Sequence, residues 1–110
     1  MPTFQHLNVS NDGDLSVVRF KDHSILGSLV KEVGEELCAV AAEETCQKLL
    51  LNLSDVDFLY SDVLGRILAA HKIMKEKGGK LTLCEVRPPI REVLAATKLD
   101  TLFEVSETGH

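Results

Sequence analysis

The chain has 110 residues, of which 45% are hydrophobic, and its mean hydropathy is +0.06. This length suits one domain with one core, and the apolar content excludes a disordered or collagen-like chain. No run reaches the roughly 18 apolar residues that a membrane span needs. The 12 Lys and Arg residues against 17 Asp and Glu give a net charge of −5, so nucleic acid and anionic membrane surfaces are poor partners.

The amino terminus and the cysteines both favour a reducing cytoplasm. Residues 1–5 lack the cationic and apolar regions of a secretory signal. Cys38, Cys46 and Cys84 are odd in number and form no Cys-x-x-Cys pair, which argues against a disulfide framework, a structural zinc site and a dithiol redox motif. We therefore expect a cytoplasmic protein with small buried or half-exposed thiols and with no metal or organic cofactor.

The first half of the chain predicts a hairpin followed by a helix. Residues 4–9 and 15–20 are the expected strands, and the connection 11–14 contains Asn and Gly, which supply the positive φ of a tight turn. A helix of about 15 residues follows, because apolar residues recur at helical spacing. These residues are Leu29, Val33, Leu37, Val40 and Ala41. Glutamates on the other face of this helix predict an acidic, solvated surface.

The second half alternates strands and helices. The apolar run 48–53 is too short for a helix and is typical of a central strand buried on both faces of a sheet. Ser61 offers an N-cap hydroxyl to the next helix, and Gly78-Gly79 is a C-cap signal that ends it. The remaining expected elements are a strand over 81–86, a helix opening at Pro88-Pro89 and a terminal strand near 103–105. This order predicts an α/β fold: a mixed β-sheet with an N-terminal hairpin and helices packed against it.

No standard catalytic or phosphate-binding motif occurs in the sequence. His71 lies on or beside the apolar stripe of the predicted Ser61 helix, where a core or boundary imidazole is the simpler interpretation. Asp55 and Asp57 alternate with apolar residues, so they point to the same side and form either paired carboxylates or a solvated loop edge. Ser61 opens a helix just beyond a central strand, where free N–H groups favour an anion, although an N-cap role alone explains the residue.

The pattern as a whole resembles a STAS domain over nearly the entire chain. The segments that carry the resemblance are 49–59 (LLLNLSDVDFL), Ser61 with Leu64-Gly65, 77–84 (KGGKLTLC), 93–94 and 99–103 (LDTLF). This family contains bacterial anti-sigma factor antagonists and the cytoplasmic tails of sulphate transporters. The resemblance implies a mixed sheet with helices against it and, at this chain length, an antagonist without a transporter portion.

In the antagonists the corresponding helix begins with a motif similar to Asp-Ser-Ser/Thr-Gly-Leu-Gly, whose hydroxyl is phosphorylated by a partner that is both a serine kinase and an anti-sigma factor. Aligned on Leu64-Gly65, this chain has Tyr60 for the Asp, keeps the first hydroxyl as Ser61, and has Asp62 for the second. Val63 replaces the Gly of the motif. The resemblance makes Ser61 the candidate for phosphorylation.

The leading hypothesis is a non-catalytic signalling module that binds a kinase-type anti-sigma factor and so frees a sigma factor for transcription. The expected partner-binding residues are Asp57, Tyr60, Ser61, Asp62, Leu64 and Gly65. The alternative is a STAS-like module that binds a small anionic or lipidic ligand or scaffolds a signalling complex. A hydrolase that uses Ser61 or a Cys-His pair is a third class. The oligomeric state, the cognate partner and the input signal stay open at this point.

Overall fold

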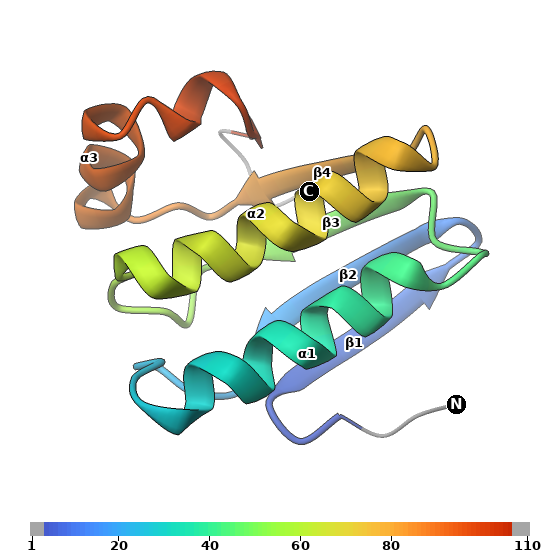
Figure 1. The fold of residues 1–110 in the computed structure, drawn as a ribbon, viewed down its shortest axis with the longest axis horizontal. Coiled ribbons are helices and arrows are strands. Elements are labelled where there is room, and N and C mark those ends of the chain that lie inside the picture. The colour runs from blue at the N-terminus through green and yellow to red at the C-terminus, as the bar shows by residue number, and fades with distance from the viewer. Residues whose placement is uncertain (1–3, 107–110) are drawn as a thin grey trace.

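The computed structural model describes residues 4–106, which form a sheet of five strands, three α-helices and one 3-10 helix. In chain order the elements are β1 (Leu7–Asp12), β2 (Leu15–Phe20), α1 (Ser28–Ala42), β3 (Lys48–Asn52), α2 (Ser61–Glu76), β4 (Lys80–Cys84), α3 (Pro88–Ala96), η1 (Leu99–Thr101) and β5 (Glu104–Val105). The elements follow the predicted order (Figure 1).

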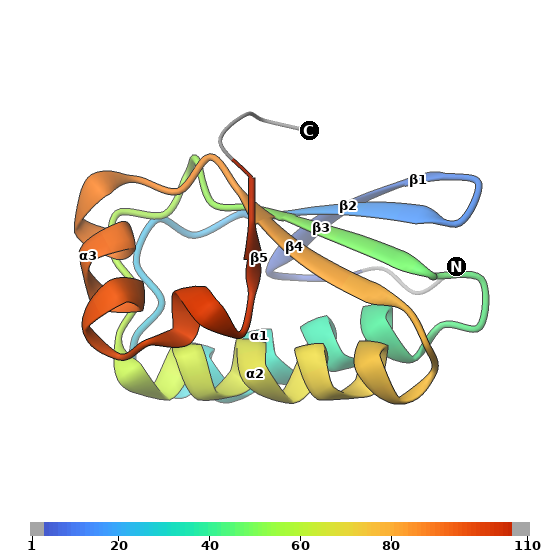
Figure 2. The ribbon, with the colours of Figure 1, turned by 90° about the horizontal axis from the view of Figure 1, so that it is seen from above.

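The sheet is mixed, as the sequence predicts. Its strand order is β1-β2-β3-β4-β5; β1 pairs antiparallel with β2, and every later pair is parallel. Parallel neighbours need a crossover connection, which α1 supplies between β2 and β3 and α2 supplies between β3 and β4. Figure 2 shows that α1 and α2 lie side by side on the same face of the sheet, while α3 lies at one end of it. The α/β fold class is thereby confirmed.

The hairpin differs from its predicted boundaries. β1 begins three residues later than expected, and the turn contains only Gly13 and Asp14, because Asp12 pairs with Leu15. Gly13 has the positive φ of 63° that this tight turn requires, whereas Asn11 pairs with Ser16 inside the ladder. The Ser16 hydroxyl also donates a hydrogen bond of 2.9 Å to Asn11 Oδ1. These contacts explain why a polar stretch continues the strand instead of forming the loop.

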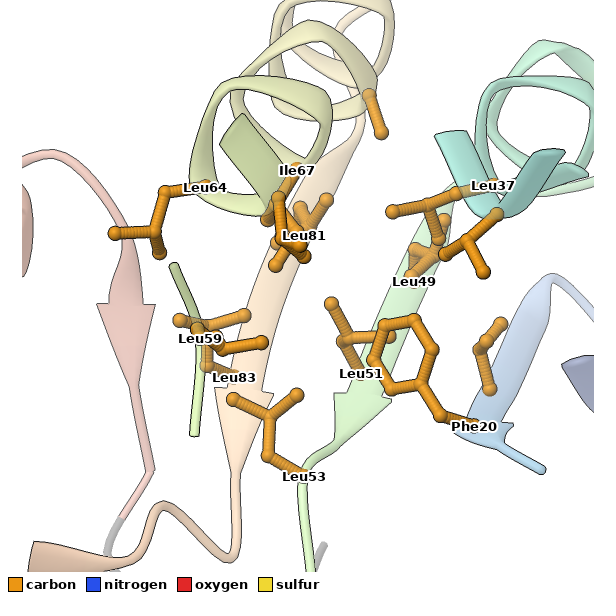
Figure 3. Close-up of a cluster of buried hydrophobic side chains, with 14 of the residues drawn as sticks. Phe20, Leu37, Leu49, Leu51, Leu53, Leu59, Leu64, Ile67, Leu81 and Leu83 are labelled. Carbon is orange, nitrogen blue, oxygen red and sulfur yellow. The ribbon is translucent and has the colours of Figure 1, made fainter. Parts of the chain in front are cut away.

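The core lies between the sheet and the α1–α2 layer. Leucines from β3 and β4 point toward helix residues Leu37 and Ile67, and all of these side chains are at most 1% exposed (Figure 3). Successive strand residues face opposite sides, so Leu50 lies on the face that α1 and α2 leave uncovered. Leu50 is nevertheless only 8% exposed, since Val17 and Thr82 flank it on the neighbouring strands. The central strand is therefore buried as predicted, with helices on one face only.

The predicted C-terminal end of α2 is confirmed. Gly78 has a positive φ of 79°, and its N–H donates to the Lys75 carbonyl oxygen at 3.1 Å. The Gly79 N–H donates to the Met74 carbonyl oxygen at 2.8 Å. These two bonds satisfy carbonyl groups that the helix leaves without an internal partner. The chain then enters β4 directly, which fixes the position of α2 against the sheet.

Candidate functional site

The segment between β3 and α2 is held to the core by regularly spaced apolar residues. Leu53, Val56 and Leu59 are each 0% exposed, whereas Asp57 and Tyr60 are exposed to solvent. The buried side chains fix the path of this loop. The polar residues between them therefore appear at the surface in a defined order, directly before the first turn of α2.

Two arginines from other parts of the chain pair with the aspartates of this loop. The Arg19 guanidinium on β2 donates to Asp55 Oδ2 at 2.8 and 3.1 Å and to the Ser54 hydroxyl at 3.2 Å. The Arg87 guanidinium, between β4 and α3, donates to the Ser54 carbonyl oxygen at 2.9 and 3.2 Å and lies 3.4 Å from Asp57 Oδ1. Each aspartate has its own arginine, so the two carboxylates form a charged loop edge and not an acid-base pair.

A second loop, residues 21–27 before α1, is attached to the same edge. His23 Nδ1 lies 2.7 Å from the Asp55 carbonyl oxygen, and the Asp57 N–H donates to the His23 carbonyl oxygen at 3.0 Å. The two loops lie together at the end of the sheet where β2 and β3 finish (Figure 1). Two exposed large hydrophobic side chains belong to these loops: Leu26, with 53% exposure, and Tyr60, with 47%.

The helix start corrects the prediction that Ser61 is an N-cap residue. Tyr60, with ψ of 164°, occupies the N-cap position, and its carbonyl oxygen accepts the N–H of Leu64 at 3.0 Å. Ser61 is the first helical residue, and no side chain caps the helix. The Asp62 carboxylate instead accepts the Val63 N–H at 2.9 Å. The helix therefore begins one residue earlier than the hydroxyl pattern indicates.

Five of the six predicted partner-binding residues are exposed around the beginning of α2. We call this set the α2-start surface: Asp57, Tyr60, Ser61, Asp62 and Gly65. Leu64 is the exception, because it is 4% exposed and points into the core (Figure 3). Phe58, which the sequence reasoning missed, supports this surface from the side: its ring meets Tyr60 edge-to-face with centroids 4.9 Å apart.

His71 occupies the boundary position that the helical pattern predicts, but it is not a satisfied imidazole. Its ring meets Phe103 edge-to-face at 5.3 Å, and its Nδ1 is buried without a hydrogen-bond partner. Burial, reinforced by the charge of Lys75, lowers the pKa of His71 below its ordinary value. His71 is ten residues after Ser61 on the same helix, which separates their backbones by about 15 Å. The two side chains are therefore too far apart to act as a nucleophile and its base.

The cysteines and carboxylates form no reactive or metal-binding cluster in the described part of the chain. Cys46 and Cys84 are buried and Cys38 is half-buried, and burial raises the pKa of the Cys38 and Cys84 thiols. Within residues 4–106, no group of three or more His, Cys, Asp or Glu side chains could hold a metal ion. No helix over the same residues has the length and apolar character to cross a membrane.

A mixed sheet with helices on one face, and a helix that starts from an arginine-held loop at the sheet edge, make this chain a small α/β module. The STAS domain family model matches residues 7–110, and the chain belongs to this family. The anti-sigma F factor antagonist of Paenibacillus polymyxa is 37% identical over 60 residues, which cover 54% of this chain and 51% of that relative. The match thus spans about half the length of that curated relative.

Several solved structures share the fold, and two of them illustrate the likeness. One is an anti-sigma-factor antagonist (STAS) domain protein from Planctomyces limnophilus, with 24% identity and a TM-score of 0.82 over 93% of this chain and 89% of that one. The other is the Bacillus cell fate determinant SpoIIAA in its phosphorylated form, with 14% identity and a TM-score of 0.70 over 92% and 91% of the two chains. At these identities the likeness establishes the fold alone.

Proposed function

We propose that this protein is a non-catalytic signalling module that binds an anti-sigma factor with serine kinase activity through the α2-start surface. The carrying observation is that Tyr60, Ser61 and Asp62 are exposed together on a rigid support. Arginines 19 and 87 hold the preceding loop, and buried leucines anchor the helix. Preorganised, exposed aromatic groups are favourable anchors for a protein partner. The curated relative from Paenibacillus, an anti-sigma F factor antagonist, supports this class of partner.

Ser61 is the phosphoacceptor in this proposal. Its side chain is exposed and does not cap α2, so a kinase can reach the hydroxyl without removing a helix cap. A phosphate on the first helical residue is favoured by the helix dipole and adds a charge of about −1.5 to −2 beside Asp62. SpoIIAA, which has the same fold, exists in a phosphorylated form. Phosphorylation would then weaken the interface by adding negative charge beside Asp62.

The two competing classes have less support. A Ser61–His71 hydrolase has no support from the geometry, because His71 lies almost three turns away along α2, and Cys46 and Cys84 are buried. A site for a small anionic or lipidic ligand would need a pocket that encloses most of the ligand surface. Tyr60, Ser61 and Asp62 of the α2-start surface are exposed to solvent instead.

The test is a pull-down from the source cell with tagged wild-type protein and with the Tyr60→Asp and Ser61→Asp variants. Wild-type protein should recover a kinase-type anti-sigma factor, and both variants should lose it. Glu44→Ala, an exposed change beyond the end of α1, is the matched control and should retain it. Phosphopeptide mapping after incubation with ATP and the recovered partner should place phosphate on Ser61. Recovery of only membrane or metabolic proteins, or phosphate found only on Ser54 or Thr82, contradicts the proposal.

A further inference from the structure

A groove follows the outer side of α2, beginning one turn after Ser61. It has a volume of about 390 Å³, and its walls come from α2 and from the residue that follows η1. Its lining residues are Gly65, Leu68, Ala69, His71, Lys72, Lys75 and Leu102. From its position and chemistry we propose that this groove binds an acidic amphipathic helix of a protein partner.

The groove has an apolar floor with a fixed outer wall. Leu68 and Ala69 contribute aliphatic surface on the α2 side, and Leu102 contributes the other side. Leu102 is 43% exposed and is one of only three exposed large hydrophobic residues among those the structure describes. Its neighbour Phe103 is buried, and the edge-to-face contact of that ring with His71 ties the segment after η1 to α2. The exposed leucine is therefore held in place, as an anchor for a partner must be.

The charge on the groove is of one sign. Lys72 and Lys75 line it, and none of the seven lining residues is acidic. This contrasts with the whole chain, whose net charge is −5. Apolar surface beside two lysines is complementary to a segment that carries leucine-like residues on one face and carboxylates along the edge of that face. The resulting attraction would be strongest at low salt.

The direction of the groove favours a helical segment. From Gly65 to Lys75 the α2 backbone rises about 15 Å, or almost three turns, which matches a partner helix with anchors at i, i+4 and i+7. A second copy of this chain fits less well, because the exposed residues of its acidic helix α1 include alanines but no large hydrophobic side chain. The groove is also open along its length, and this shape suits a docked helix better than an enclosed small ligand.

This inference rests on the proposed function, because Gly65 belongs both to the groove and to the α2-start surface. A partner bound at Tyr60 and Ser61 could extend along α2 into the groove without a gap. The two proposals can still be refuted separately, since the groove is tested below with a synthetic peptide and the α2-start surface is tested with the cellular partner.

The experiment titrates the full chain, labelled with nitrogen-15, with a synthetic helical peptide of about 14 residues that carries leucines at i, i+4, i+7 and i+11 and glutamates beside them. A second peptide has lysine in place of every glutamate. We expect the glutamate peptide to shift the amide signals of Gly65, Leu68 and Leu102. The double variant Lys72→Glu, Lys75→Glu should weaken this binding at least about tenfold and should bind the lysine peptide instead.

Two further variants make the result specific. Leu102→Ser removes the exposed apolar anchor and should also weaken the binding of the glutamate peptide at least about tenfold. Lys31→Glu reverses one lysine charge on the exposed side of α1, away from the groove, and should leave the affinity unchanged. Four results would each overturn the inference. Two concern the peptides: equal binding of both, or no shift of amide signals along α2. The others are self-association through the groove, or binding of dodecanoate in the groove while the glutamate peptide does not bind.

Discussion

At Gly65, in the α2-start surface, one added methyl group should change the free energy of unfolding and the partner affinity in opposite directions. A Cβ added to Gly65 would meet no heavy atom within 4 Å, and the residue lies inside α2 with ordinary helical dihedrals. Gly65→Ala should therefore raise the free energy of unfolding by the helix propensity difference, about 0.8 to 1 kcal/mol. With a urea m-value of about 2 kcal/mol/M, the unfolding midpoint should move up by roughly 0.5 M.

Gly79 is the opposite case, because an added Cβ there would come too close to neighbouring atoms. A Cβ there would lie 2.7 Å from the Gln47 carbonyl oxygen and 2.9 Å from Met74 Cε, and the backbone oxygen cannot move aside cheaply. Gly79→Ala should therefore lower the free energy of unfolding by about 1 to 3 kcal/mol. Urea denaturation followed by circular dichroism measures both variants. A less stable Gly65→Ala protein, or an unchanged Gly79→Ala protein, would refute the reasoning from local space.

The same Gly65→Ala variant tests the proposed interface. The added methyl group projects from the α2-start surface, so partner affinity should fall although the fold becomes more stable. If damage to the fold caused the loss of binding, the variant would instead be less stable than the wild-type protein. Opposite signs in the two measurements thus identify a direct effect on the interface.

Two further predictions concern ionisable groups. The Asp62 carboxylate accepts the Val63 N–H in the first turn of α2. Asp62→Ser should therefore lower the free energy of unfolding by about 0.3 to 1 kcal/mol and leave partner affinity unchanged. A tenfold gain in affinity would instead identify the carboxylate as a built-in off switch. Burial disfavours the charged His6 ring, but the hydrogen bond with Asp22 and the nearby carboxylates of Glu32 and Glu36 outweigh this and raise the pKa of His6 above its ordinary value of 6.5. A raised pKa stabilises the fold fully below pH 6.5, and this contribution is lost as the pH rises through the folded-state value. The loss of stability in His6→Gln should consequently be larger at about pH 5.5 than at about pH 8.5 in urea titrations, and equal losses would contradict this pairing.

The sequence predicted the fold because its strongest local signals agree with the tertiary contacts. The leucine run of β3 has no alternative to burial, and Gly78 supplies the left-handed residue that ends α2. The hairpin was less predictable, because Asn11 and Gly13 both accept turn conformations. The ladder contact between Asn11 and Ser16 decides between them, and that contact exists only after β1 and β2 have paired.

The candidate site was predictable only in part for a similar reason. The position of Ser61 beyond a central strand follows from local pattern, but the N-cap residue is Tyr60, whose side chain does not cap the helix and so gives no local signal for the exact start. No sequence pattern indicated that Arg19 and Arg87 contact this loop, since each lies about 30 residues or more from its aspartate along the chain. Only the parallel sheet, which brings the carboxyl ends of its strands to one edge, places these arginines beside the loop.

In the proposed function, these arginines also determine how a phosphate on Ser61 would act. Both guanidinium groups are already engaged with the loop, Arg19 with Asp55 and Arg87 with the Ser54 carbonyl oxygen and Asp57. The loop before Ser61 is therefore already held in place before modification, and the dipole of α2 would stabilise a phosphate where it forms. The modification would then act by changing the charge of the α2-start surface. A switch of this kind acts on the partner through electrostatic repulsion, so its effect should decrease as the salt concentration rises.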